Sequence, residues 1–120
     1  MSNKHIPTEI TLHKQQRSLE IAFNDGSRFD LPCEYLRVNS PSAEVQGHGP
    51  GQEVLQVGKE DVNIEKIEQV GTYAIQPSFD DGHESGIYAW DTLYNLGVNY
   101  EKYWQDYLDK LAAAGHQRKA

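Results

Sequence analysis

Cysteine, long apolar runs and basic charge are all scarce in this chain, and each scarcity excludes a class of protein. Cys33 is the only cysteine among the 120 residues, so no disulfide within the chain and no all-cysteine zinc site can form. No run approaches the ~18 apolar residues that a membrane-spanning helix needs. The first ten residues, MSNKHIPTEI, lack the apolar core of a signal peptide. We therefore expect a cytoplasmic protein with no membrane partner.

Acidic residues outnumber basic ones by 18 to 11, which gives a net charge of -7. Proteins that bind nucleic acid or anionic lipid carry clusters of Lys and Arg instead. The acidity belongs to the body of the chain, because residues 98–120 hold four basic and three acidic side chains. We therefore expect no nucleic-acid partner, and another protein as the partner.

Composition and length indicate one folded domain. The chain is 38% hydrophobic and 24% charged, which is ordinary for a globular protein. A chain of 120 residues buries roughly two-thirds of its unfolded surface, which is enough for a core without disulfides or metals.

Alternating apolar and polar residues predict strands over residues 8–13 and 18–23, and the NDGS sequence that follows predicts a tight turn. The sequence then predicts a short strand at RFDL, a helix over residues 32–38 and a loop over residues 39–53. Strands are expected over residues 54–57, 62–69 and 73–76, and Pro77 is expected to stop the last of them.

The C-terminal part changes to a helical pattern. WDTLYNLG predicts one or two helical turns closed by Gly97, and Asn99 is suited to cap a helix of about fifteen residues. Apolar side chains recur along one face of this helix, at Tyr100, Trp104, Tyr107 and Leu111. This stripe favours core packing over a protein interface. Strands followed by helices predict an α+β domain, mainly antiparallel.

The stretch FDDGHESGIY, residues 79–88, carries the main candidate for chemistry. His83 stands among Asp80, Asp81 and Glu84, and carboxylates near an imidazole suit a metal ligand or a general base. The alternative is a tight Asp-Gly turn with solvated acids. Spacing alone favours the turn. A two-histidine metal site would need His48 from the 39–53 loop.

Other candidates carry weaker signals. His5 and His116 fall in expected tails and His13 at a strand end, so structural or solvated roles are favoured. Cys33 is expected to be a small buried hydrophobe. The glycine-rich stretch GHGPGQE lacks the Gly-Lys-Ser/Thr ending of a phosphate-binding loop.

Several ordered landmarks resemble a known family. FNDGSRFDLPCEYLRVNSPSAE and IEQVGTYAIQPSFDDGHESGIYAWDTLYNLG are similar to the N-terminal domain of gamma-butyrobetaine hydroxylase and trimethyllysine hydroxylase. The resemblance covers residues 8–97. It implies a division into a tail (1–7), the hydroxylase-like domain (8–97), a C-terminal helix (98–114) and a second tail (115–120).

The resemblance also implies the location of a zinc site. In the hydroxylases, three cysteines after a Leu-Arg pair and one downstream histidine hold zinc; Leu36 and Arg37 match the pair. The cysteine positions fall on Ser40, Ser42 and Val45, and the histidine falls on His83. One ligand of four is kept, so the degenerate site is not expected to hold structural zinc.

Three hypotheses for function follow, in order of preference. The first is a non-catalytic binding module, with a metal linked through His83 as one form of it and a candidate surface of Arg37, Asp80, Asp81, His83, Glu84 and Trp90. The second is an adaptor in iron–sulfur cluster assembly, because the domain also resembles an appendage of some P-loop ATPases. The third is a small enzyme that uses His83 and Asp81 as an acid–base pair. We expect no catalytic activity, since no nucleophile or cofactor motif stands beside His83.

Overall fold

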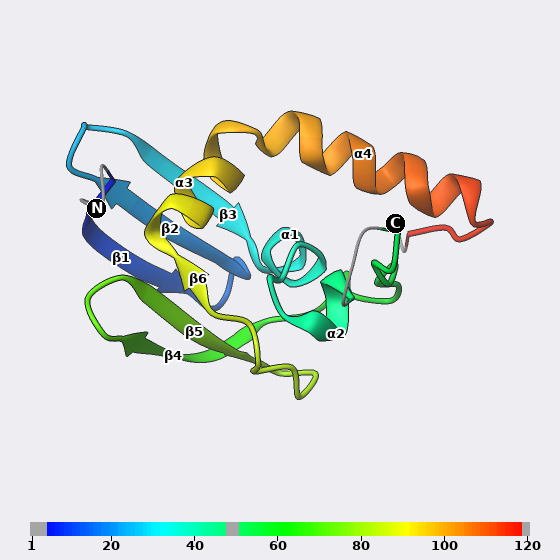
Figure 1. Ribbon diagram of the computed structural model, residues 1–120, viewed down its shortest axis with the longest axis horizontal. Coiled ribbons are helices and arrows are strands. Elements are labelled where there is room, and N and C mark those ends of the chain that lie inside the picture. The colour runs from blue at the N-terminus through cyan, green and yellow to red at the C-terminus, as the bar shows by residue number, and fades with distance from the viewer. Residues whose placement is uncertain (1–4, 48–50, 119–120) are drawn as a thin grey trace.

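The computed structural model describes residues 5–47 and 51–118 (Figure 1). Within these residues the chain forms two three-stranded antiparallel sheets and four helices, and no helix there is long and apolar enough to cross a membrane. The helices are α1 (Cys33–Val38), α2 (Ala43–Gln46), α3 (Trp90–Val98) and α4 (Tyr100–Ala113). Figure 1 shows the sheets at one end of the molecule, with α4 running from α3 past α1 towards the C-terminus. The architecture confirms the α+β class.

The first sheet is a meander in the order β1-β2-β3, with bounds Pro7–His13, Ser18–Phe23 and Arg28–Pro32. The predicted NDGS turn joins β2 to β3: the Phe23 amide donates to the Ser27 carbonyl (2.8 Å), and Gly26 adopts a φ of 89°. A positive φ favours glycine, so the Asp-Gly sequence specified this turn.

The second sheet contains β4 (Ile64–Val70), β5 (Ala74–Phe79) and β6 (Tyr88–Ala89). The prediction that Pro77 stops a strand was wrong, because β5 continues through it. Odd-numbered residues along β5 direct their backbone N–H and C=O groups away from β4. The Tyr73 carbonyl accepts from the Trp90 amide, and the Phe79 amide donates to the His83 carbonyl. Pro77 lacks an N–H on that side, where no bond to β4 is lost.

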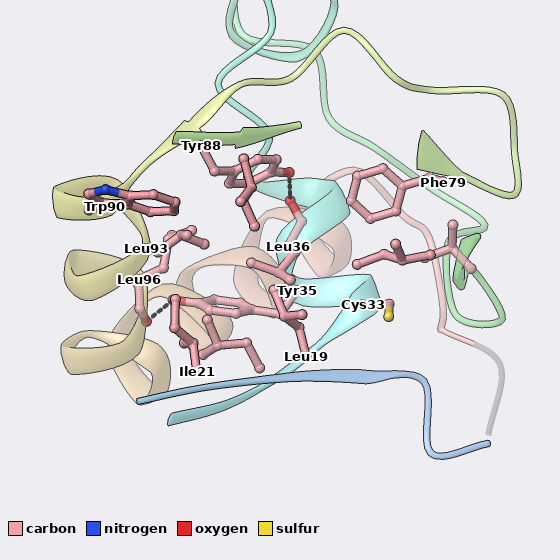
Figure 2. Close-up of a cluster of buried hydrophobic side chains, with 14 of the residues drawn as sticks. Leu19, Ile21, Cys33, Tyr35, Leu36, Phe79, Tyr88, Trp90, Leu93 and Leu96 are labelled. Atoms are coloured by element: carbon pink, nitrogen blue, oxygen red, sulfur yellow. Dashed lines mark hydrogen bonds between the residues drawn. The ribbon is translucent and has the colours of Figure 1, made fainter. Parts of the chain in front are cut away.

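Side chains from both sheets, α1 and α3 meet in the core (Figure 2). Its fully buried members include Leu19 and Ile21 of the first sheet, Phe79 and Tyr88 of the second, and Leu93. Figure 2 shows Leu93 and Leu96 of α3 on one side of this cluster and α1 in its middle.

Two buried tyrosines tie α1 to its neighbours. The Tyr35 hydroxyl donates to the Leu96 carbonyl of α3 (2.6 Å), and the Tyr88 hydroxyl of β6 donates to the Leu36 carbonyl (2.5 Å). Both bonds satisfy hydroxyls that would otherwise be costly to bury. As a result α1 is fixed relative to both α3 and the second sheet.

Helix α4 packs by the stripe that the sequence predicted. Tyr107 and Leu111 are buried with Val38 of α1, while Tyr100 and Trp104 are partly buried against the core. Core packing of this face is therefore confirmed. Gly115, with a φ of 77°, ends the helix as expected.

Gly97 and Asn99 do not act as the sequence suggested. Helix α3 continues through Gly97 to Val98, and a Cβ at position 97 would lie 2.4 Å from Cγ of Phe29. The glycine therefore admits the Phe29 ring instead of ending the helix. Asn99 precedes α4, but its side chain makes no cap bond and donates to the Asn95 carbonyl (3.0 Å).

The expected loop over residues 39–53 contains a short helix, and the expected strand over residues 54–57 is absent. The helix is α2, capped by Ser42, whose hydroxyl accepts from the Glu44 amide (3.2 Å). Residues 54–57 have no regular structure. Val54 instead donates its amide to the Val45 carbonyl (2.7 Å), so this segment is fastened to α2 and not to a sheet.

Candidate functional site

The FDDGHESGIY stretch is a tight turn after β5. The Phe79 amide donates to the His83 carbonyl (2.9 Å), the Gly82 amide donates to the Phe79 carbonyl (3.1 Å), and Gly82 has a φ of 91°. These bonds close an Asp-Gly turn, as one of the two interpretations of the sequence required. The turn is also a site of contact, because its side chains face residues 37–44 of the chain.

Asp81 anchors the turn to its surroundings. One carboxylate oxygen accepts from the His83 amide (3.1 Å), and the other accepts from Nε of Arg37 (2.9 Å) and Nζ of Lys59 (2.7 Å). Burial alone would raise the pKa of Asp81, but these donors outweigh it and hold the pKa at about 2. The carboxylate bonds to the amide of His83 and to two cations, which is not the arrangement of an acid–base pair with the imidazole.

His83 points inward and meets Ser40. The residue is 4% exposed, and its Nε2 lies 2.9 Å from the Ser40 hydroxyl, which is 0% exposed. Nδ1 lies 3.4 Å from Oε2 of Glu44 but makes no hydrogen bond. Burial, and then the positive charge of Arg37, lower the pKa of His83. Both effects favour the neutral form of the imidazole.

Two further hydroxyl contacts join the same segments. The Ser42 and Ser85 hydroxyls lie 2.7 Å apart, and the Ser85 hydroxyl donates to Oε1 of Glu44 (2.9 Å). We call Ser40, Ser42, Glu44, His83 and Ser85 the His83 cluster. It fastens the start of α2 to the turn after β5.

Serine, histidine and glutamate in this order resemble a hydrolase triad, but the geometry does not support nucleophilic attack. A Cβ at Gly86 would lie 2.4 Å from the Ser40 hydroxyl oxygen, so the backbone of the turn covers that oxygen. A nucleophile needs an open position beside it for the reacting carbonyl. The Glu44 carboxylate also lacks the hydrogen bond to Nδ1 that orients a catalytic imidazole.

A groove lies next to the cluster, between α1, α2, residues 53–56 and α4. Its volume is about 460 Å³, within the range of small binding pockets. Its apolar lining comes from Val38, Val45, Val54, Leu55 and Tyr107, and its polar lining includes Gln46, Glu53, Asp106 and Lys110. The Gln46 amide nitrogen donates to the Ser40 carbonyl (2.8 Å), which connects the groove to the cluster.

The other residues of the expected surface are dispersed. Asp80 accepts from the Asn63 amide (3.0 Å), and the Glu84 carbonyl accepts from the Gln76 side chain (2.6 Å). Trp90 is buried in the core, where its indole N–H donates to the Thr72 carbonyl (2.8 Å).

The remaining histidines and Cys33 lie away from the His83 cluster. His5 stacks on Tyr94, His13 bonds to Glu20 (2.8 Å), and His116 follows α4. His48 lies outside the described residues. Cys33 is fully buried, and burial raises its pKa to about 11, so it is the inert hydrophobe expected.

Lys59, Glu44 and Ser85 belong to this site, and sequence reasoning did not single them out. Glu44 carried one usable signal, since Ser42 before it is a good helix N-cap residue and predicts a helix start. Nothing in the local pattern indicated Lys59.

Comparison with known protein families identifies the family of this chain. The sequence model of the gamma-butyrobetaine hydroxylase-like, N-terminal family matches residues 10–94. The chain belongs to this family. No curated protein matches it at a significant level.

Solved structures of similar proteins share the fold. Two solution NMR structures are 48% and 45% identical with TM-scores of 0.84 and 0.82; each match covers 98% of this chain, and 92% and 90% of the other. A crystal structure from Acidithiobacillus ferrooxidans, described as a protein of unknown function of the DUF971 family, is 35% identical with a TM-score of 0.64. That match covers 76% of this chain and 91% of the other.

The donors in this member of the family do not fit the zinc that the resemblance implied. The hydroxyl of Ser40 occupies Nε2 of His83, Ser42 faces Ser85, and Val45 offers no donor atom. Across residues 5–47 and 51–118, no group of three or more His, Cys, Asp or Glu side chains could hold a metal ion. Hydrogen bonds join the segments that the resemblance places around zinc.

The low pKa of Asp81 predicts a loss of stability in acid. Its folded pKa of about 2 lies below its ordinary value of 3.8, so its contribution is present above pH 3.8 and is lost as the pH falls through about 2. We expect this loss to be about 2 kcal/mol. Urea unfolding of the wild type and of Asp81→Asn between pH 6 and pH 2 measures it. The stability gap between the two proteins should shrink in acid, and a constant gap would contradict the assignment.

Proposed function

We propose that this family member is a non-catalytic module that binds a short segment of another protein in the groove between α1, α2, residues 53–56 and α4. One observation carries the proposal: a groove lined by both apolar and polar side chains lies open beside a polar cluster that is itself closed. Val54 is 54% exposed at the groove, whereas Ser40 and His83 are buried beneath the turn. Apolar surface rimmed by polar groups is typical of protein-binding sites.

The His83 cluster acts on the groove through α2. This helix is only four residues long, so it depends on tertiary contacts to hold its place. Ser40, Ser42 and Glu44 fasten its start to the turn after β5, while Val45 and Gln46 of the same helix line the groove. The cluster positions one wall of the groove and does not contact the ligand.

The rim favours a segment that is apolar in its middle and polar at its ends. Val45, Leu55 and Tyr107 would cover an apolar side chain, and the amide nitrogens of Gln46 and Gln56 near them already donate to the Ser40 and Val54 carbonyls. The Tyr107 hydroxyl already donates to the Gln56 carbonyl (2.7 Å), so this part of the wall is held before any ligand arrives. Preorganised walls lower the entropic cost of binding.

The alternatives have less support from the geometry. A metal-linked form of the first hypothesis would require His83 to leave its bond with Ser40. An adaptor in iron–sulfur assembly would also act through protein contacts, but no feature of the described residues points to such a partner. An enzyme would require Ser40 or His83 to reach a substrate. A fluorophosphonate probe, which labels active serine nucleophiles, is accordingly expected not to label Ser40.

Unbiased peptide selection followed by mapping tests the proposal. Peptides selected from a random library on the whole chain should lose binding in Val54→Asp and keep it in Val98→Asp. Val98 is a matched control, because it is also an exposed valine (60%) but lies at the end of α3. We expect a loss of about tenfold or more, since a charge would enter an apolar contact. Peptides that ignore Val54→Asp, or a library that yields no binder, would contradict a groove-binding function.

A further inference from the structure

A second contact site lies between α1 and α4, around Glu34. Nε of Arg118 donates to one carboxylate oxygen of Glu34 (2.8 Å), and a terminal guanidinium nitrogen donates to the other. The guanidinium carbon lies 5.1 Å from the centroid of the Trp104 ring. One carboxylate and one indole therefore hold this arginine by a two-pronged hydrogen bond and a stacking contact.

Glu34 requires a cation at this position. Its side chain is only 8% exposed, and a buried carboxylate without a partner is costly. Arginine fits better than lysine, because its planar fork matches both carboxylate oxygens while its face lies against the ring. The site is thus built for a guanidinium group, whichever chain supplies it.

The bound arginine comes from an exposed segment without regular structure, and we infer that it can be exchanged. Arg118 follows the helix-ending Gly115 by three residues, and residues 116–118 are exposed and without regular structure. The Arg118 side chain is 33% exposed, four times the exposed fraction of Glu34. Leaving the site would cost the guanidinium its bonds to Glu34 and its attraction to Glu60, whereas Glu34 would stay in place on α1.

We propose that Glu34 and Trp104 form a binding site for an arginine side chain of a partner protein, and that Arg118 occupies this site in the free chain. The site is separate from the groove, although the two are neighbours: Glu34 and Val38 lie one turn apart on α1, and the rings of Trp104 and Tyr107 lie 5.3 Å apart on α4. The inference goes beyond the groove and stands if the groove binds nothing.

Vacating the site provides the test. N-acetyl-arginine methylamide is titrated into the whole chain carrying Arg118→Ala, and the indole N–H signals of the two tryptophans are followed by NMR. Trp104 should shift saturably. Trp90 is an internal control, because its indole is bonded to the Thr72 carbonyl in the turn between β4 and β5 and should not move. The lysine analogue should bind about tenfold more weakly, since it cannot bond to both oxygens at once.

Two further variants fix the interpretation. Arg118→Ala combined with Glu34→Gln should abolish the Trp104 shift. The wild type should need about tenfold more arginine analogue than Arg118→Ala, because Arg118 competes with the analogue for Glu34. If Arg118→Ala does not fold, Arg118→Lys keeps a cation and is titrated instead, with the arginine analogue expected to raise its melting temperature. No saturable shift, an equal response to the lysine analogue, or binding that survives Glu34→Gln would overturn the proposal.

Discussion

The triple variant Ser40→Cys, Ser42→Cys, Val45→Cys is expected to bind zinc tightly, although the wild type should bind it weakly at best. The structure places the Ser40 side chain 2.9 Å from Nε2 of His83, and Ser42 and Val45 follow on the same short segment. Three thiolates and an imidazole are a strongly favoured zinc set, with apparent binding free energies of about 10–16 kcal/mol in small domains.

The matching control removes the imidazole from the triple variant. Zinc affinity is measured by competition with a chromophoric chelator, with and without His83→Ala. A clear loss with His83→Ala is expected, because the imidazole supplies the fourth ligand and closes the tetrahedron. Equal affinities would show that the cysteines bind zinc alone and that the 40–45 segment does not share a site with His83.

Leu93→Ala is expected to destabilise the fold by about 2–5 kcal/mol. Leu93 is 0% exposed, and it reaches from α3 into the cluster formed by both sheets and α1 (Figure 2). Truncation would leave a cavity among rigid neighbours that include two hydrogen-bonded tyrosines. Urea unfolding at neutral pH measures the change in the free energy of unfolding.

Val98→Ala is the control for this prediction. Val98 lies on the same helix but is exposed, so its loss should change stability by no more than about 0.5 kcal/mol. Similar effects for the two variants would contradict a core in which α3 holds the two sheets together.

Local pattern predicted most of the regular structure. The first two strands followed from alternation at residues 8–13 and 18–23, because Leu19, Ile21 and Phe23 of β2 enter the core and Ile10 and Leu12 of β1 pack against it. The C-terminal helix followed in the same way from its apolar stripe.

The errors fall where tertiary contacts override local signals. Residues 54–57 have strand-like composition, yet their neighbour is α2 and not a sheet edge. Pro77 is a strong stop signal, but it is harmless on the side of β5 that faces away from β4. The absence of a side chain at Gly97 makes room for the Phe29 ring, and a sequence pattern does not reveal this contact.

In the candidate site, too, local features were predictable from the sequence and contacts between distant residues were not. The Asp-Gly turn around His83 was readable, because turn chemistry is local. Ser40 and His83 are 43 residues apart in sequence, and only the family resemblance suggested that they meet. Glu34 and Arg118 are 84 residues apart, and neither pattern nor resemblance indicated their contact.

The most direct test of the proposed function is the affinity of a groove-binding peptide for His83→Gln, measured by calorimetry well below the melting temperature. If the buried His83 cluster does no chemistry and instead fixes α2 as a wall of the groove, binding should be roughly tenfold weaker, because the peptide must then order α2 as it binds. Unchanged affinity in a folded His83→Gln protein would contradict this prediction, since the cluster would then have no part in binding.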